Sequence, residues 1–398
     1  MLGTVSLPGV NVVGPFEAEL GNGETARMLV AALDAAGVPC LPIGFVASAS
    51  RQGHAFPHAT DPEALFPVSI LCVNADQTPR FHARLGERFF AGRRTIGVWW
   101  WETTLLPPWL AESFAYVDEV WAGSAFVAEA LRPAAGSTPV HQVDLPVRWP
   151  DAPALPRDAL GLPDDRPVVL FSFDHNSVLD RKNPQGAIEA FRRAFPVPGP
   201  DGPVLLVKSI NGDRHPAAHD RVLQAAAGHP DVIVRDGYLD AADRDGLVAA
   251  CDVYLSLHRA EGFGLTLAEA LALGKPVIAT GWSGSTEVLD EASGFPVRFV
   301  PRPVGPEQGP YPAEGVWAEP DLEHAAALLR DVLGDLSRAR AHAAAGRERV
   351  RTRFSAEACA GPLAQRVRRA TPWQARVLPD REVRTAREIA AGLRARRA

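Results

Sequence analysis

The sequence predicts an α/β protein made of two Rossmann-like domains that face each other across a cleft. The chain has 398 residues, too many for one small core and about right for two domains. In both halves, short apolar runs rich in β-formers alternate with helical patterns, an alternation typical of parallel sheets. A proline-dense stretch separates the halves and marks a boundary between domains.

The composition is that of a soluble globular protein, with 46% hydrophobic and 22% charged residues. The net charge of −6 argues against nucleic-acid binding. The N-terminal residues lack the basic start of a signal peptide, and no apolar run approaches the ~20 residues of a membrane span. We expect a cytoplasmic protein without bound metal, because its cysteines are scattered with no pairing or ligand spacing: Cys40, Cys72, Cys251 and Cys359.

The first domain begins with a strand, a glycine-containing loop and a helix. Val10–Val13 reads as the strand, residues 16–23 as the loop and Glu24–Ala36 as the helix, which Gly37 ends. A glycine-rich turn between strand and helix can approach a phosphate, but the spacing departs from the dinucleotide fingerprint. A plain flexible loop is the alternative.

Three further strands are predicted in this half, at Val68–Val73, Thr95–Trp101 and Val117–Ala122. Polar residues follow them at the carboxyl ends of the strands, the edge where α/β sheets bind ligands. These residues are Asn74, Asp76, Glu102 and Ser124. Successive side chains of a strand alternate between faces, so the tryptophans at 99–101 cannot all point into the core.

Prolines accumulate between the two halves, at Pro146, Pro150, Pro153, Pro156, Pro163 and Pro167. We therefore predict a first domain at 1–150, a linker at 151–167, a second domain at 168–360 and a basic C-terminal segment at 361–398. Proline density restricts the flexibility of such a linker.

The second domain opens with a strand at Val168–Phe173, and Asn183–Pro184 starts its first helix. Arg181 and Lys182 lie just before this helix, at the ligand edge of the sheet, where a diphosphate requires positive charge. A solvated charge pair is the alternative. Later strands at Val204–Val207 and Val232–Val234 lead to further candidates at that edge, namely Lys208 and the turn at Asp236, Gly237 and Tyr238.

The most informative stretch runs from Arg259 to Val288. It reads as a loop at 261–264, a helix at Leu265–Leu273, a strand at Pro276–Thr280 and a loop at 281–285. A glycine-rich loop before a helix offers backbone N–H groups and the positive end of the helix dipole to an anion. Glu261 and Glu269 can lie on the order of 10 Å apart, which suits two carboxylates at opposite ends of one extended ligand.

The phrase LHRAEGFGLTLAEALALGKPVIATGWSG, with its two glutamates separated by seven residues, carries a resemblance. It resembles the signature of family four of the retaining glycosyltransferases with the GT-B fold, in the bacterial surface-polysaccharide branch. An ordinary βαβ unit with solvated glutamates is the alternative. The resemblance implies a nucleotide-sugar site in the second domain, an acceptor site in the first and a last helix that returns to the first.

The resemblance also implies roles for individual residues. Lys182, with Arg181 as the runner-up, would neutralise the donor diphosphate, Glu261 would bind the sugar or support the transition state, and Glu269 would hold the ribose. In many relatives a histidine ends the strand that ends here in Glu102, so Glu102 would take the polar role near the sugar. The other donor contacts would be Phe263, Gly264, Leu265, Thr266, Ser283 and Gly284, with Tyr238 near the base and Gly23 opposite the diphosphate. Lys208 lies at the same edge and is a further candidate for the donor site, with a solvent-facing lysine as the alternative.

These expectations combine into one predicted reaction. A sugar would move from a UDP- or GDP-linked donor to a saccharide or lipid-linked acceptor, with retention of configuration and without cofactor or metal, in polysaccharide or glycolipid assembly. The alternatives are a sugar phosphorylase or nucleotide-sugar epimerase on the same fold, and a non-catalytic binding protein. The Asp-x-Asp at 243–245 resembles a metal motif of another glycosyltransferase fold, but it opens a predicted helix, so we reject it as a metal site.

We identify no candidate catalytic or ligand-binding residue in the remaining C-terminal part of the sequence. Residues 294–315, rich in proline and glycine, read as loop, and Asp321–Leu336 and Ala339–Phe354 read as amphipathic helices. The basic segment from Val367 onward, with Trp373, is predicted to pack on the first domain. A peripheral contact with anionic lipid, which would place the protein at the inner face of the membrane, is the minority hypothesis.

Overall fold

The computed structural model describes residues 9–45, 50–59, 65–150, 153–370, 388 and 390–395. The chain forms two compact units. The first contains Met1–Trp101, Leu106–Arg148 and Thr352–Ala398, and the second contains Glu102–Leu105 and Trp149–Arg351. The predicted boundary at residue 150 lies beside this division, but Glu102–Leu105 belong to the second unit, which the sequence did not suggest.

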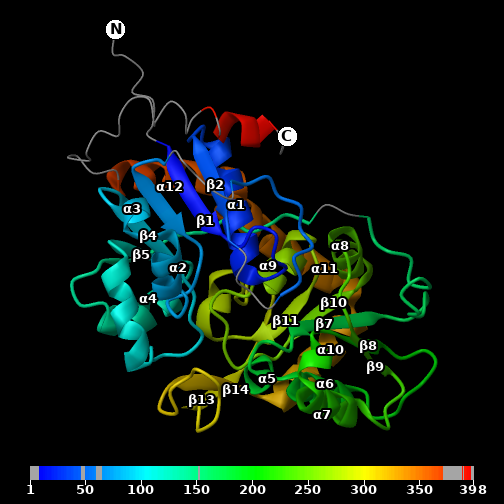
Figure 1. Ribbon diagram of the computed structural model, residues 1–398. Helices are drawn as coiled ribbons and strands as arrows, with labels where there is room; N and C mark the ends of the chain where they lie inside the picture. Colours follow the sequence, from blue (N-terminus) through cyan, green and yellow to red (C-terminus); the bar gives the residue numbers. More distant parts are fainter. Residues whose placement is uncertain are drawn as a thin grey trace. The chain divides into compact units, whose positions relative to one another are not determined.

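The first unit is built on a six-stranded parallel sheet with strand order β2-β1-β3-β4-β5-β6 (Figure 1). Apart from β6 and the terminal residues Gly44 and Arg94, its strands are buried along their length, since helices cover both faces of the sheet. They span Val10–Gly14 (β1), Cys40–Gly44 (β2), Val68–Leu71 (β3), Arg94–Trp99 (β4), Glu119–Ala122 (β5) and Val140–Gln142 (β6).

Two layers of side chains pack on this sheet. On one face, α1 and α12 lie side by side and bury leucines and alanines against β1, β3 and β4 (Figure 1). On the other, Phe81 and Phe89 pack near Val13, Leu41 and Leu71. The helices are Gly21–Ala35 (α1), Thr78–Leu85 (α2), Glu87–Phe90 (α3), Ala125–Leu131 (α4) and Ala356–Ala370 (α12), with 3-10 turns at Pro108–Tyr116 and Arg132–Ala134.

The second unit repeats the architecture with a parallel sheet of order β12-β11-β10-β7-β8-β9. The order reverses beside β7, and in open α/β sheets ligands bind near such a switch point. The strands span Val168–Asp174 (β7), Val204–Ile210 (β8), Val232–Asp236 (β9), Val253–Ser256 (β10), Val277–Thr280 (β11) and Phe295–Val297 (β12). The predicted strands of this domain are therefore present.

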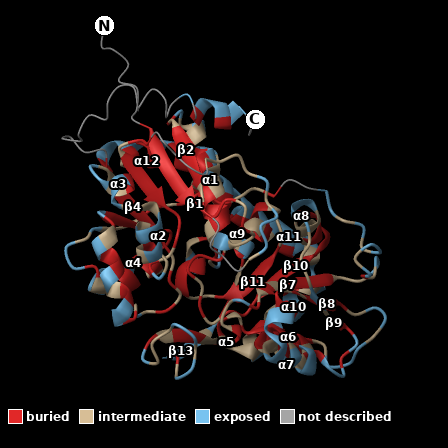
Figure 2. Cartoon of the chain, in the orientation of Figure 1, coloured by how far each residue is buried: buried red, intermediate tan, exposed pale blue. Residues whose placement is uncertain are grey.

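Helices α6, α7 and α10 cover one face of this sheet, and α8, α9 and α11 lie on the other (Figure 1). Figure 2 shows that the central strands β7, β8, β10 and β11 are largely buried while the outer sides of the helices are exposed. The helices span Leu179–Lys182 (α5), Pro184–Ala194 (α6), Pro216–Ala226 (α7), Ala241–Ala250 (α8), Leu265–Ala272 (α9), Leu322–Gly334 (α10) and Leu336–Arg349 (α11). Short turns of helix lie at Gly212–Arg214, Ser283–Glu287 and Val350–Phe354.

Two local predictions about helix starts are confirmed. Asn183 caps α6 by accepting a hydrogen bond from the Gly186 amide, and Pro184 occupies the first helical position. The rejected metal motif at 243–245 lies in the first turn of α8, where Asp240 is the N-cap and accepts from the Asp243 amide over 2.8 Å.

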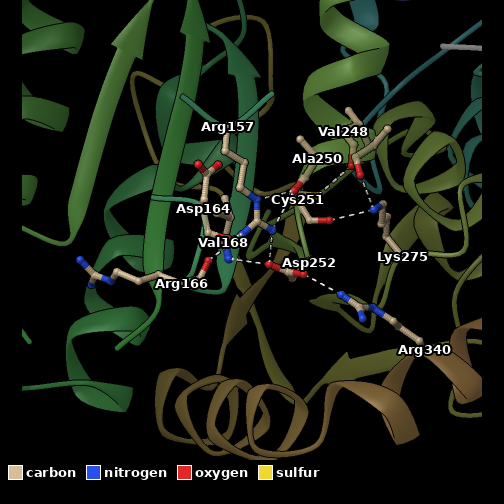
Figure 3. A network of polar contacts seen from close by, with 11 residues as sticks. Arg157, Asp164, Arg166, Val168, Val248, Ala250, Cys251, Asp252, Lys275 and Arg340 are labelled. Carbon is tan, nitrogen blue, oxygen red and sulfur yellow. Dashed lines mark hydrogen bonds and ion pairs between the residues drawn. The ribbon is translucent and has the colours of Figure 1, made fainter. Parts of the chain in front are cut away.

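The proline-rich segment after residue 152 is fixed to the second unit by a polar network (Figure 3). At its centre, Asp252 accepts from Arg157 over 2.6 Å, from Arg340 over 2.6 Å and from the Val168 amide over 2.9 Å. Lys275 of the signature donates nearby to the carbonyls of Ala249 and Cys251. This lysine thus holds the start of β10 in place, at the end of the strand opposite the candidate site.

The prediction that residues 294–315 form only a loop is wrong. Besides β12, the stretch contains β13 (Phe299–Pro303), which pairs antiparallel with β14 (Val316–Pro320) in a separate two-stranded ribbon. Proline removes ladder donors, and the sequence therefore argued against strands. A two-stranded edge tolerates proline, because only one side of each strand has to pair.

The C-terminal part of the chain returns to the first unit at Thr352, earlier than the predicted residue 361. Within that unit, Ala390 and Leu393 are buried in the cluster that contains Phe81, and Arg394 donates to the Asp34 carbonyl over 3.0 Å. Trp373 and most of the basic segment lie outside the described residues.

Candidate active site

The signature directly follows β10 and folds as predicted, into a glycine loop, α9 and β11. Gly264 has a φ of +88°, a conformation that glycine adopts without strain, and it directly precedes the first residue of α9. Its carbonyl accepts from the amides of Leu267 and Ala268. The first amides of a helix point along its axis beyond the N-terminus and lack partners within the helix. The loop therefore ends in donors suited to an anion.

A second loop supports the first through a close approach of two glycines. The Gly284 amide donates to the Glu261 carbonyl over 2.8 Å, and a Cβ at Gly284 would lie 1.9 Å from the Gly262 carbonyl oxygen. Ser283, at a φ of +71°, accepts from the Glu261 amide over 2.9 Å. The structure thus packs the predicted sugar-side residues Ser283 and Gly284 against the predicted diphosphate loop.

Glu261 lies between two cations. Its Oε1 is bonded to the Lys182 ammonium, and its Oε2 lies 3.2 Å from Arg181 Nη1. Both cations come from the last turn of α5, and Arg181 also donates to the Ala260 carbonyl over 2.8 Å. Three residues predicted from separate parts of the sequence therefore meet at one place.

Burial and charge act in opposite directions in this cluster. Burial alone would raise the pKa of Glu261, but the charges of Lys182 and Arg181 outweigh it and lower that pKa to about 2. Burial lowers the pKa of Lys182, and the charge of Glu261 opposes that fall. Glu261 is consequently ionised at any physiological pH, and its charge is part of what keeps Lys182 protonated.

Glu102 joins the same cluster through a residue that the sequence analysis did not identify. The Tyr311 hydroxyl donates to Glu102 Oε2 over 3.0 Å, and the charge of Glu102 acts on both Arg181 and Lys182. The next residues are held by the ribbon as well, since Thr104 accepts from the Val316 amide over 2.9 Å. Tyr311 lies between β13 and β14, where the proline-rich pattern contained no signal for a site residue.

His258 was also missed, although it belongs to the quoted signature. It is fully buried, with Nδ1 3.0 Å from the Ser256 hydroxyl and Nε2 2.9 Å from the Ser285 hydroxyl. Burial lowers its pKa to about 4, so the imidazole is neutral. It connects the end of β10 to the loop after β11. Its position just after β10, at the ligand edge of the sheet, could have identified it as a site residue from the sequence.

Arg259 fixes the backbone before Glu261. Its guanidinium forms a two-pronged pair with Glu319 of β14, at 2.8 and 2.9 Å, and donates to the Asp180 carbonyl. Its own amide donates to the Arg181 carbonyl over 2.7 Å. The strand end, α5 and the ribbon are thereby joined around the cluster.

The residues predicted near the base lie at the carboxyl end of β8 and β9. Tyr238 donates to Asn211 Oδ1 over 3.0 Å. Lys208 donates to the carbonyls of Ser209 and Gly237, and burial lowers its pKa to about 8. Glu269 is half-buried on α9. Lys208 thus holds the turn before Tyr238, and contacts of these residues with a nucleotide remain predictions.

Gly23 lies differently from the prediction, because α1 begins at Gly21 and places it in the first helical turn rather than in a loop. A Cβ at Gly23 would lie 2.5 Å from the Ala18 carbonyl and 2.7 Å from that of Pro15. Packing inside the first unit therefore already requires glycine here. Of the three tryptophans at 99–101, only Trp100 is not buried.

A family model described as "Family 4 Glycosyltransferase in conflict systems" matches residues 124–363, more than half of the chain. The chain belongs to this family. The protein is thus a glycosyltransferase, and the predicted enzyme class is confirmed. The match says nothing about a polysaccharide branch, and no curated relative matches the sequence.

Solved structures confirm the predicted GT-B fold of this glycosyltransferase. Sucrose-phosphate synthase from Thermosynechococcus elongatus matches with a TM-score of 0.64 at 19% identity, over 91% of this chain and 98% of that one. A glycosyltransferase from Rickettsia africae gives 0.64 at 17%, over 92% and 100%. HepE of Anabaena, solved with UDP-glucose, gives 0.63 at 15%, over 90% and 99%. Among the described residues, no helix is long and apolar enough to span a membrane.

Proposed function

We propose that this glycosyltransferase moves a sugar from a nucleoside diphosphate sugar, UDP- or GDP-linked, to a saccharide or lipid-linked saccharide. The cluster of Glu261, Lys182 and Arg181 beside the start of α9 carries the proposal. Two cations and the N-terminus of a helix provide positive charge where a diphosphate would leave. The UDP-glucose bound by HepE supports a UDP-linked donor as the first to test.

In the proposed donor complex, the amides of Phe263, Gly264, Leu265 and Thr266 bind the diphosphate. Lys182 and Arg181 neutralise the charge that develops as the bond to the sugar breaks. Glu269 accepts from the ribose hydroxyls, and the turn at Tyr238, which Lys208 supports, lies at the base. Ser283 and Gly284 border the sugar.

Glu261 has two tasks in this proposal. It accepts hydrogen bonds from the sugar or stabilises the positive charge that its ring acquires in the transition state. It also holds Lys182 and Arg181 in position, which avoids reorganising these cations during the reaction. The Tyr311 hydroxyl directs one oxygen of Glu102, and Glu102 then takes the polar role beside the sugar.

We further propose that transfer retains the anomeric configuration and proceeds without a metal. The leaving diphosphate accepts the proton of the acceptor hydroxyl, so no separate enzymic base is required. The ionised state of Glu261 at neutral pH supports a charge-stabilising role, because a general acid would need a raised pKa. A role in polysaccharide or glycolipid assembly inside the cell completes the proposal and rests on the sequence resemblance alone.

The test begins with thermal-shift screening of the full-length protein against UDP-, GDP- and other nucleotide-linked sugars. Acceptors are then screened with the stabilising donor, and product NMR reads the anomeric configuration. Lys182→Ala and Glu261→Ala should each lose transfer by several orders of magnitude. Arg193→Ala, which removes an exposed cation from α6, is the matched control and should retain wild-type turnover.

Two outcomes would overturn the proposal. Near-wild-type turnover by Lys182→Ala or by Glu261→Ala would remove the substituted residue from the reaction and refute the assigned cluster. An inverted product would refute retention while leaving the donor site intact. Glu269→Ala should mainly weaken UDP binding in calorimetry, with a smaller effect on turnover at saturating donor.

A further inference from the structure

A second group of side chains with metal-ligand chemistry lies in the second unit, outside the cluster described above. It consists of His175, in the loop after β7, His219 on α7 and Asp236 at the end of β9. Each offers one ligand atom, and these atoms all lie within 4.8 Å of one another. Parallel pairing of β7 with β8 and of β8 with β9 fixes the strands that hold His175 and Asp236.

Buried ring nitrogens of the two histidines have no hydrogen-bond partner within the described structure. His175 is 3% exposed, and neither of its ring nitrogens has a hydrogen-bond partner within the described structure. The Nδ1 atom of His219 is likewise buried without one. A neutral imidazole has one N–H group that donates a hydrogen bond and one nitrogen lone pair that accepts one. Burying either group without a partner is unfavourable. The rings of His175 and His219 pack edge to face, with centroids 5.4 Å apart.

The carboxylate favours a cation over an anion here. Asp236 accepts from the Ser209 hydroxyl over 2.7 Å and from the Gly212 amide over 3.0 Å, and it forms no ion pair within the described residues. Hydrogen bonds of this kind orient carboxylates that bind metals. Lys208 is near enough for Asp236 to raise its pKa, but its ammonium is bonded to the carbonyls of Ser209 and Gly237.

Gly212 supplies a further geometric argument. A Cβ at this residue would lie 2.8 Å from Asp236 Oδ2 and 2.9 Å from His219 Nδ1. These two atoms therefore lie on the same side of Gly212. In a tetrahedral zinc site with bonds of about 2.0 Å, ligand atoms lie about 3.3 Å apart, a separation within reach of side-chain rotation.

We propose that His175, His219 and Asp236 bind one divalent transition-metal ion, with Zn²⁺ as the best fit. Two imidazoles and a carboxylate match the ligand preference of zinc, and an exchangeable ligand completes the four positions. The ion would satisfy the buried histidines and tie α7 to the loops after β7 and β9. Asp236 directly precedes the turn at Tyr238, which the proposed function places at the nucleotide base, so metal binding is measured in the absence of any substrate.

The experiment uses the full-length protein, without a histidine tag and treated with a chelator. Titration with Zn²⁺ by calorimetry should give one site per chain, and Co²⁺ should give the visible absorption of a tetrahedral complex. His219→Ala and Asp236→Asn should each weaken Zn²⁺ binding by more than about 100-fold, because they remove ligands. Ser209→Ala should weaken it by about 10-fold, because it removes only the support of Asp236.

His215→Ala is the matched control, since His215 is a nearby exposed histidine paired with Asn176 over 3.0 Å. It should bind Zn²⁺ like the wild type. Far-UV circular dichroism of each metal-free variant verifies its fold, and Asp236→Asn preserves the side-chain volume if His219→Ala unfolds. Binding below one ion per chain, or equal losses in His215→Ala and Asp236→Asn, would overturn the proposal.

Discussion

The hydroxyl of Tyr311 donates a hydrogen bond to Glu102 across 3.0 Å, although 209 positions separate the two residues in the chain. Glu102 lies in the short segment Glu102–Leu105, which belongs to the second unit although it comes from the first half of the chain. Tyr311 lies between the two strands of an antiparallel ribbon. The contact therefore orients a carboxylate whose charge acts on both Arg181 and Lys182.

Tyr311→Phe removes this hydrogen bond and keeps the ring. With Glu102 no longer oriented, we expect turnover to fall by about 10-fold or more, with little change in UDP affinity. Steady-state kinetics with saturating donor measure the fall, and calorimetry measures the affinity. Tyr116→Phe, a half-buried tyrosine of the first unit, is the control. Unchanged turnover in Tyr311→Phe would mean that Glu102 needs no such support.

Glu261→Gln should change the pH dependence of donor binding. The charge of Glu261 opposes the fall that burial causes in the pKa of Lys182, so neutralising it lowers that pKa further. Lys182 is protonated below its pKa. As the pH rises, the variant should therefore lose UDP affinity at a lower pH than the wild type.

Calorimetric titrations with UDP between about pH 7 and pH 10 would follow this loss. Glu189→Gln, on the exposed surface of α6, is the matched control and should follow the wild-type curve. If the Glu261→Gln and wild-type curves coincide, Lys182 is not the group that titrates.

His258 should make the stability of the second unit depend on pH. Its pKa is about 4 in the folded protein, against 6.5 as the ordinary value. Between these values the unfolded chain binds more protons, so the free energy of unfolding falls as the pH falls. One pKa unit corresponds to about 1.4 kcal/mol, which gives a loss of about 2 kcal/mol from this group between pH 7 and pH 5.

His258→Gln retains hydrogen-bonding atoms for Ser256 and Ser285 but does not titrate. Urea unfolding at pH 7 and pH 5 should show a loss of stability that is about 2 kcal/mol smaller in the variant than in the wild type. Equal losses in both proteins would show that His258 takes up its proton without cost in the folded state.

Gly284→Ala should separate the two loops that border the site. The added Cβ would lie 1.9 Å from the Gly262 carbonyl oxygen, a distance that forces the backbone to move. We expect a destabilisation of about 1–3 kcal/mol and a marked loss of UDP affinity, because the loop before α9 shifts with it. Gly334→Ala, whose Cβ would meet no atom within 4 Å, should leave the affinity unchanged. Wild-type affinity in Gly284→Ala would show that the loop before α9 does not depend on this contact.

The regular part of the fold was predictable, because buried parallel strands and capped helices leave local patterns. The run from Val253 to Thr280 contains two apolar strands and an uninterrupted helix flanked by Gly264 and Gly274, and in the structure both of these glycines have a positive φ. The meeting of Lys182 with Glu261 followed from a general rule, since both lie in segments that follow the carboxyl ends of the neighbouring strands β7 and β10.

The features that could not be predicted from the sequence depend on contacts between residues that are distant in the chain. Phe299–Pro303 forms a strand despite its prolines, because it pairs on one side only, with Val316–Pro320. Nothing local indicates that Tyr311 is a partner of Glu102. The group of His175, His219 and Asp236 was invisible for the same reason, since its members follow different strands and helices without a recognisable spacing.

The four residues from Glu102 to Leu105 are built into the second unit although the chain on either side of them belongs to the first. A protein fragment that starts at Trp149 would therefore lack Glu102–Leu105, a part of its own domain that includes the acceptor of the Tyr311 hydroxyl. A single cut of the chain therefore cannot separate the two domains intact. In a chimaera that joins halves of two homologues, the second domain would contain residues from both parent proteins.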